Sequence, residues 1–263
     1  MKLSEEENKE IFDLTIGGIG LTGTIVSITF QLTKIKSQKF ITKKIEINNI
    51  EECKEKILKE GENPSYIYSW NRADTLKNFG KGIIYKNNVL DDAGVFNEFE
   101  KCKNNFKPFI FPLWNKYSIN CINFIYLKIN QLTKSEKKED FLSVIFPFYK
   151  KENYFNFFGK KGFIESQLLV HQSKFDSFML EFRNLFKKHE PTITLFSLKN
   201  MSGEQKFLRF EDNKICITLD YVNNSKNLLF MSKIDNLYEK YEILPSIIKD
   251  SRITKKIFDK SYK

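Results

Sequence analysis

Apolar and polar residues alternate along several stretches of this chain and recur at helical spacing along others. Alternation is typical of strands, and apolar residues three or four positions apart are typical of amphipathic helices. Alternation predicts strands at residues 24–35, 40–48, 65–72, 80–86, 140–149, 162–171, 192–201, 206–210 and 214–221. Helical spacing predicts helices at residues 49–61, 174–189 and 227–241.

Charged residues add two expectations to this pattern. Ser4 followed by three glutamates predicts the start of a short helix over residues 4–12, because the hydroxyl can cap a helix and the acids suit its N-terminus. The charge run at residues 134–140 predicts an exposed loop. Together the elements predict an α+β fold, with a mostly antiparallel sheet and helices packed on one face.

Amino-acid composition indicates the class of protein and the kinds of partner it favours. Hydrophobic residues make up 41% and aromatic residues 15% of the 263 residues, which indicates a globular protein and not a disordered one. The formal net charge of +10 favours anionic partners, such as phosphates or a bilayer surface. No helix-turn-helix or base-stacking signature accompanies the charge, so we expect no nucleic-acid partner.

Cysteine usage, the N-terminal sequence and the apolar content indicate the cell compartment. The four cysteines form no C-x-x-C pair and only two histidines accompany them, so we expect no metal site and a reducing compartment. The charged N-terminus does not resemble a signal peptide, and no window of ~18 apolar residues predicts a membrane span. We therefore expect a cytoplasmic protein. An aromatic segment at residues 107–129 leaves peripheral contact with the inner membrane open.

Three glycines near the N-terminus, Gly18, Gly20 and Gly23, have the spacing G-x-G-x-x-G of a dinucleotide-binding turn. That kind of site needs a helix after the turn, because the helix N-terminus holds the diphosphate. Here a strand is predicted at residues 24–35, and no Lys-Ser/Thr pair follows that would make a P-loop. The pattern alone therefore favours a tight structural turn.

The residues around the glycines, ENKEIFDLTIGGIGLTGTIVSITFQL, add a family resemblance. This stretch resembles the end of the FAD-binding domain in FAD-linked oxidases of the vanillyl-alcohol-oxidase type. Within that type it is most similar to the decaprenylphosphoryl-ribose 2'-oxidase-like proteins. The resemblance continues in order through residues 65–88, 146–171, 202–221 and 243–262, the last of which contains KDSR.

The resemblance implies a domain organisation and an activity. Residues 1–35 would be the end of a truncated FAD-binding domain, residues 36–242 a substrate-binding domain, and residues 243–263 a segment returning to the flavin. In the family, FAD takes a hydride from a hydroxyl of a polyprenyl-phosphate sugar, and a partner reductase acts on the keto product. The nucleotide-binding half has no counterpart here, so we expect the isolated chain to be inactive and colourless. A truncated gene product, a split gene with a separately encoded N-terminal half, and a degraded copy remain open.

The resemblance also assigns site residues. Lys249 would be the catalytic residue beside flavin and substrate, where an ammonium stabilises the anionic charge of the reduced flavin. The cofactor-binding residues would be Gly18, Gly20, Gly23, Thr24 and Ile25. The substrate-binding residues would be Trp70, Gln167, Cys216 and Thr218.

Several positions depart from the family pattern. Glu165 and Ser166 replace a glutamine and a tyrosine, and Phe158 and Ser246 each stand where the family has a tyrosine. These changes favour a different sugar or a cell-envelope polyol as the substrate. The alternative function is a non-catalytic remnant, or a module that binds an anionic sugar-phosphate or a membrane surface.

Overall fold

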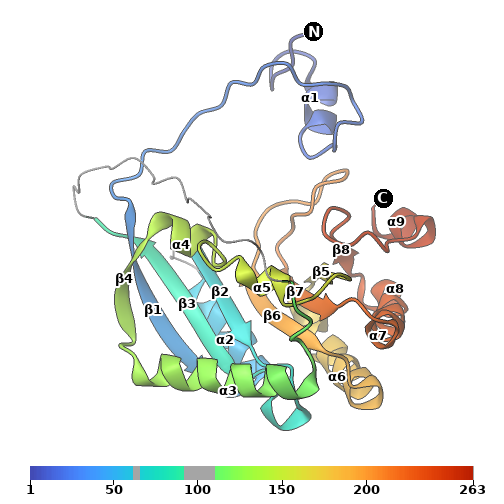
Figure 1. The fold of residues 1–263 in the computed structure, drawn as a ribbon. Coiled ribbons are helices and arrows are strands. Elements are labelled where there is room, and N and C mark those ends of the chain that lie inside the picture. Colours follow the sequence, from blue (N-terminus) through green and yellow to red (C-terminus); the bar gives the residue numbers. More distant parts are fainter. Residues whose placement is uncertain (62–65, 92–109, 263) are drawn as a thin grey trace.

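The computed structural model describes residues 1–61, 66–91 and 110–262, and within them the fold is α+β with two four-stranded antiparallel sheets. The first sheet has the order β2-β3-β1-β4 and the second the order β6-β7-β5-β8 (Figure 1). The strands are β1 Lys39–Ile47, β2 Tyr66–Asn71, β3 Gly82–Val89, β4 Glu136–Asp140, β5 Phe163–Val170, β6 Ile193–Asn200, β7 Ile215–Val222 and β8 Leu244–Pro245.

Helices connect and cover the sheets. They are α1 Lys9–Thr15, α2 Ile50–Glu60, α3 Lys116–Leu132, α4 Phe141–Ile145, α5 Asn153–Asn156, α6 Gln172–His189, α7 Ser225–Asp235, α8 Tyr238–Tyr241 and α9 Lys255–Ser261, with a 3₁₀ turn at Leu76–Asn78. The two sheets meet at their edge strands β2 and β6, where the backbone N–H of Leu198 donates to Ser69 Oγ at 2.8 Å (Figure 1).

The main core lies between the sheets and helices α2, α6 and α7. Phe175, Phe178 and Phe182 of α6 are at most 1% exposed and pack against buried residues of β6 and β7. Amphipathic spacing along α6 predicts this burial, because residues three and four apart share one face of a helix.

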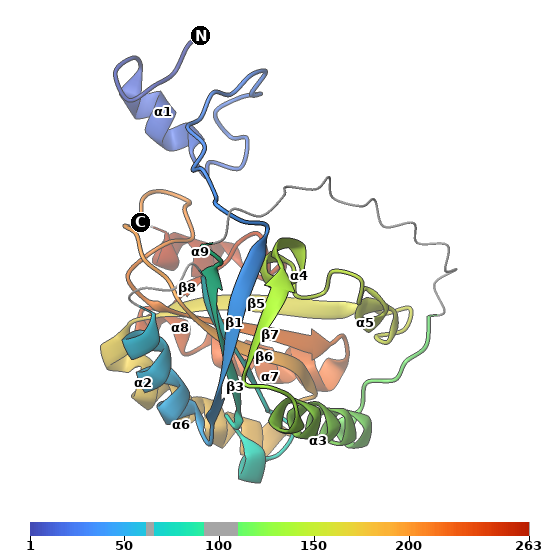
Figure 2. The same cartoon turned by 90° about the vertical axis from the view of Figure 1, so that its left-hand side faces the viewer.

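Helices cover both faces of the first sheet, so the prediction of helices on one face was wrong. Helix α3 lies across from α2 with strands β1 and β3 between them (Figure 2). Trp70 and Tyr85 contact Tyr126 of α3 on one face, while Ile67 joins the core with α2 on the other. Both faces can be covered because successive side chains of a strand point to opposite sides.

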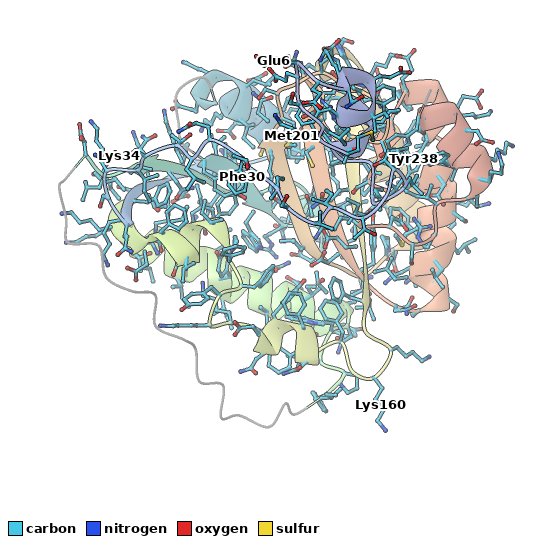
Figure 3. The ribbon with its side chains drawn as sticks, turned by 90° about the horizontal axis from the view of Figure 1, so that it is seen from above. Glu6, Phe30, Lys34, Lys160, Met201 and Tyr238 are labelled. Carbon is cyan, nitrogen blue, oxygen red and sulfur yellow. The ribbon has the colours of Figure 1, made fainter. Side chains whose placement is uncertain are left out.

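The predicted strand at residues 24–35 does not form. These residues run as an extended segment over the top of the molecule, along which Phe30 and Lys34 lie (Figure 3). Val26 is 94% exposed, and no other strand in the described part of the chain pairs with the segment. Its β-branched residues suit a strand, but a strand needs a neighbouring backbone to bond with.

The N-terminal helix also differs from the prediction. Ser4 Oγ accepts the backbone N–H groups of Glu6 and Glu7 in a turn, and helix α1 begins only at Lys9. Asn8 has a left-handed backbone with φ of 56°, which separates the turn from the helix.

Three further predictions from the pattern were wrong. The charge run at residues 134–140 contains strand β4, which pairs with β1 as a charged edge strand of the kind that resists edge-to-edge association. Residues 140–149 contain helix α4 and not a strand, since Pro147 cannot donate to a ladder. Residues 206–210 form no strand, because Phe207 has φ of 51°.

Candidate functional site

A cleft of about 1150 Å³ opens on the face of the sheets opposite α6. Its walls come from both sheets, from α3, from residues 143–155 and from Lys249. A cavity of this size with apolar walls and a few polar groups has the character of a small-molecule site.

One wall of the cleft is aromatic. The rings of Trp70 and Tyr126 lie 4.5 Å apart between centroids, and those of Tyr68 and Tyr85 lie 5.2 Å apart in a stacked arrangement. The Tyr85 and Tyr126 hydroxyl oxygens are 2.7 Å apart. Burial raises the pKa of Tyr126, and that of Tyr68 and Tyr85 still further, so these phenols stay neutral at physiological pH.

The floor of the cleft is polar and comes from two neighbouring strands. Antiparallel pairing of β5 and β7 sets Gln167 opposite Thr218 and Glu165 opposite Asp220. The Gln167 amide Nε2 donates to Glu165 Oε1 at 2.9 Å. Lys249 Nζ lies 3.4 Å from Glu165 Oε2, with 46% of its side chain exposed at the rim.

Asp220 is the most unusual group of the floor. It is 2% exposed, and its Oδ2 accepts the hydroxyl of Tyr154 at 2.9 Å. Its Oδ1 is buried with no hydrogen-bond partner among the described residues. Burial, reinforced by the charge of Glu165, raises the pKa of Asp220 to about 7, while the Tyr154 hydrogen bond and the charge of Lys249 oppose the rise.

Four of the residues assigned by the family resemblance line this cleft: Trp70, Gln167, Thr218 and Lys249. They come from β2, β5, β7 and the segment after β8, which are far apart in the sequence. The fold therefore brings together residues that no local pattern would connect.

Cys216 lies beside the cleft and not in its wall. Its side chain packs with Leu169, Leu244 and Tyr262 in a second, smaller core, and its sulfur is 4.0 Å from Thr218 Oγ1. Burial raises the pKa of this thiol to about 11, so it stays protonated. Of the other cysteines, Cys102 lies outside the described residues.

The predicted cofactor residues lie elsewhere. The glycine turn packs against the loop between β6 and β7, where Arg209 donates to the backbone oxygens of Asp13 and Ile16 at 3.1 and 3.2 Å. Gly20 and Gly23 have φ of 77° and 137°, and the space beside each is open. Thr24 and Ile25 are exposed.

A flavin site would require the glycine turn and Lys249 to face one space. Lys249 lines the cleft, whereas Gly18, Gly20, Gly23, Thr24 and Ile25 do not. The open backbone at Gly20 and Gly23 suits close approach of a ligand. The described residues thus do not form a complete flavin site by themselves.

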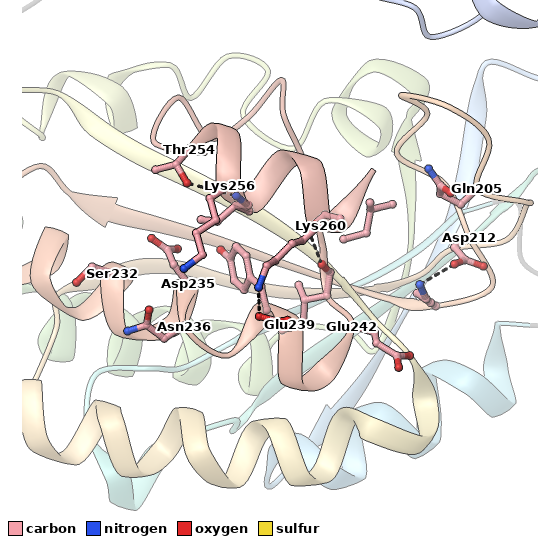
Figure 4. A pocket seen from close by; sticks show the side chains of 16 residues that line it. Gln205, Asp212, Ser232, Asp235, Asn236, Glu239, Glu242, Thr254, Lys256 and Lys260 are labelled. Atoms are coloured by element: carbon pink, nitrogen blue, oxygen red, sulfur yellow. Dashed lines mark hydrogen bonds and ion pairs between the residues drawn. The ribbon is translucent and has the colours of Figure 1, made fainter. Parts of the chain in front are cut away.

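A second cavity of about 710 Å³ lies among α7, α8, α9 and the β6–β7 loop (Figure 4). Several of its charged groups pair with one another: Lys260 bonds to Glu239, and Lys214 lies 2.7 Å from Asp212. Because these charges pair with one another, they are less available to bind a ligand than the polar groups of the cleft.

The described residues show neither a metal-binding cluster nor a helix able to cross a membrane. They contain no group of three or more His, Cys, Asp or Glu side chains able to hold a metal ion. None of their helices has the length and apolar content that a membrane crossing requires. The aromatic segment at residues 107–129 lies partly outside the described residues, and its contact with a membrane stays a prediction.

No protein-family model matches the sequence, and no curated protein matches it significantly. The likeness to FAD-linked oxidases therefore depends on the ordered motifs alone. Asp220 is not among the site residues that the sequence predicts. One signal was available, an aspartate inside the otherwise apolar strand sequence ICITLDYV, because an acid at such a position is seldom buried without a role.

Proposed function

We propose that this chain forms the substrate-binding part of an FAD-dependent oxidoreductase that oxidises a hydroxyl of a sugar or polyprenyl-phosphate sugar. The observation that carries the proposal is the convergence of Trp70, Gln167, Thr218 and Lys249 on one cleft. The resemblance assigned each of them to substrate or flavin from a different segment of the chain.

The chemistry of the cleft is suited to a sugar. The aromatic wall offers flat apolar surface, while Gln167 and Thr218 offer donors and acceptors for hydroxyl groups. Five lysines and three carboxylates line the cleft, an excess that favours a phosphorylated ligand. FAD, held largely by a separate nucleotide-binding portion, would take the hydride from the sugar carbon.

Lys249 has two tasks in this proposal. Its ammonium, half exposed at the rim, attracts a phosphate or polarises the reacting hydroxyl. Its contact with Glu165 holds the Lys249 ammonium next to Gln167, because the Gln167 amide also donates to Glu165. The three side chains therefore form one hydrogen-bonded row along the cleft floor.

The test combines binding with flavin reduction. The purified chain is titrated with D-ribose 5-phosphate, with tryptophan fluorescence as the readout, because Trp70 and Trp114 line the cleft. Free FAD is then added without oxygen, and its absorbance near 450 nm is followed with and without the sugar. We expect saturable sugar binding that Lys249→Met weakens, and no bleaching by the isolated chain, because most of the flavin site lies elsewhere.

The outcomes separate the two functions. Sugar binding that inorganic phosphate competes with equally strongly, and that Lys249→Met leaves unchanged, favours the alternative, a non-catalytic module for anionic sugar-phosphates. Absence of sugar binding contradicts the proposed function. A bound, stoichiometric flavin in the chain as purified would contradict the expectation that most of the flavin site lies elsewhere.

A further inference from the structure

The geometry points to Asp220 as the anchor of the ligand, with its buried Oδ1 accepting a hydrogen bond from a hydroxyl of the polyol bound in the cleft. This inference rests on the proposed function, because it names the contact that the same cleft makes with its ligand. It adds a residue that the family resemblance did not assign to the site.

The two oxygens of Asp220 have different surroundings. Oδ2 accepts the Tyr154 hydroxyl, and Tyr154 is itself 2.8 Å from Thr194 Oγ1. Thr194 Oγ1 in turn donates to the backbone oxygen of Asp220 at 3.3 Å. One side of the carboxyl is therefore fixed by a built network. Oδ1 has no partner in the described part of the chain, although Asp220 lines the cleft.

A buried acceptor without a donor is unfavourable, so a ligand that supplies the donor gains affinity. The nearby ammonium of Lys249 is engaged with Glu165. The described residues offer no cluster of three or more metal-binding groups that would hold a cation here. A ligand hydroxyl fits best, because it donates one hydrogen without adding a charge next to the lysines.

Binding of this hydroxyl depends on the ionisation of Asp220. The groups that act on the carboxyl are Glu165 on β5, Tyr154 on α5 and Lys249 after β8. Burial and Glu165 raise the pKa of Asp220 to about 7, so near neutral pH a large fraction carries a proton. Because Oδ2 accepts the Tyr154 hydroxyl, the proton of the neutral carboxyl lies on Oδ1, and only the ionised form accepts a ligand hydroxyl there. Ligand binding must therefore release a proton and strengthen as pH rises.

The experiment measures affinity for neutral pentitols (ribitol, xylitol and D-arabinitol) between pH 5.5 and 8.5 by calorimetry. Pentitols are chosen because a phosphate group, with its second pKa near 6, would titrate in the same range. With a pKa of about 7, the binding-competent fraction rises roughly tenfold from pH 6 to pH 8, and affinity should rise with it.

Two variants locate the effect. Asp220→Asn keeps the shape and removes the titration, so its affinity should not change with pH. Tyr154→Phe removes a hydrogen bond that favours the ionised carboxyl, so the midpoint of its pH profile should move upward. The second variant keeps the test decisive if the first does not fold, which circular dichroism would show.

The inference is overturned by pentitol binding whose affinity is constant over the pH range, or by an Asp220→Asn variant that keeps the wild-type profile. An unshifted midpoint in Tyr154→Phe would also count against it. If neither pentitols nor D-ribose 5-phosphate bind at any pH, the proposed function fails along with it. Failure of the inference alone is thus distinct from failure of the function.

Discussion

The two faces of strand β7 are equally buried and differ in chemistry. Ile215, Ile217 and Leu219 are 0% exposed and face the core with α6. Asp220 on the other face is 2% exposed and faces the cleft. Exclusion of water stabilises the first face, because buried apolar surface contributes about 25 cal/mol per Å². It destabilises an ionised carboxylate on the second.

The apolar core and the candidate site thus lie on opposite faces of one strand. The face toward α6 is packed with apolar side chains, and the face toward the cleft keeps a polar atom that has no partner among the described residues. Unsatisfied or strained groups of this kind persist mainly where a site uses them. Changes on the two faces should therefore have opposite effects on the free energy of unfolding.

The largest expected effect lies on the packed face. Phe182→Ala should lower the free energy of unfolding by about 3–5 kcal/mol, since the ring is 1% exposed and contacts Phe196 and Phe230. Urea denaturation measures the loss. Leu180→Ala on the same helix is the control, because Leu180 is 62% exposed and should cost about 0.5 kcal/mol or less. Equal losses in the two variants would contradict the assignment of the core face.

The second effect lies on the cleft face and depends on pH. The folded Asp220 has a pKa of about 7 against an ordinary value of 3.8, so between these values the folded state binds more protons than the unfolded state. Its contribution to stability is present below pH 4 and is lost as pH rises toward 7. At ~1.4 kcal/mol per pKa unit the loss reaches about 4 kcal/mol.

Asp220→Asn removes this loss and should make the protein more stable than the wild type at pH 8. The two free energies of unfolding should converge as the pH is lowered to 5. Urea denaturation at both pH values measures the difference in free energy of unfolding between the two proteins. The other carboxyl groups contribute equally to both proteins, so their contributions cancel in this difference. A constant difference between the two proteins would show that Asp220 does not titrate as the structure indicates.

Local patterns predicted the elements that place their apolar residues on one face. Strands β1, β5 and β7 and helices α2 and α6 match the predicted segments, because alternation and helical spacing record burial against a core. The same rule failed at residues 24–35, where alternation is present and no neighbouring strand is found in the described part of the chain. It also missed β4, whose charged side chains carry no alternation of burial.

The site was predictable only in part. Trp70, Gln167, Thr218 and Lys249 came from ordered motifs, and the fold places them in one cleft. The hydrogen bond that holds Asp220 Oδ2 comes from Tyr154 in a different segment, and the burial of Cys216 depends on Tyr262 near the C-terminus. Both are tertiary facts that no spacing along the chain encodes.

The smallest expected effect on the free energy of unfolding is at Lys249, the residue that the family resemblance assigns to catalysis. Lys249→Met should change the free energy of unfolding by about 1 kcal/mol or less, because its contact with Glu165 is 3.4 Å long and half exposed. D-ribose 5-phosphate should bind roughly fivefold or more weakly, a difference of about 1 kcal/mol. Fluorescence titration and urea denaturation measure the two quantities.

Lys240→Met is the matched control. Lys240 also forms an exposed ion pair, with Glu181, but on α8 and outside the cleft. The two variants should be alike in stability, and only Lys249→Met should weaken sugar-phosphate binding. An equal loss of binding in both would mean that the ligand responds to the overall positive charge. A loss confined to Lys249→Met would show that affinity depends on the polar face of the cleft and not on the charge of the whole surface.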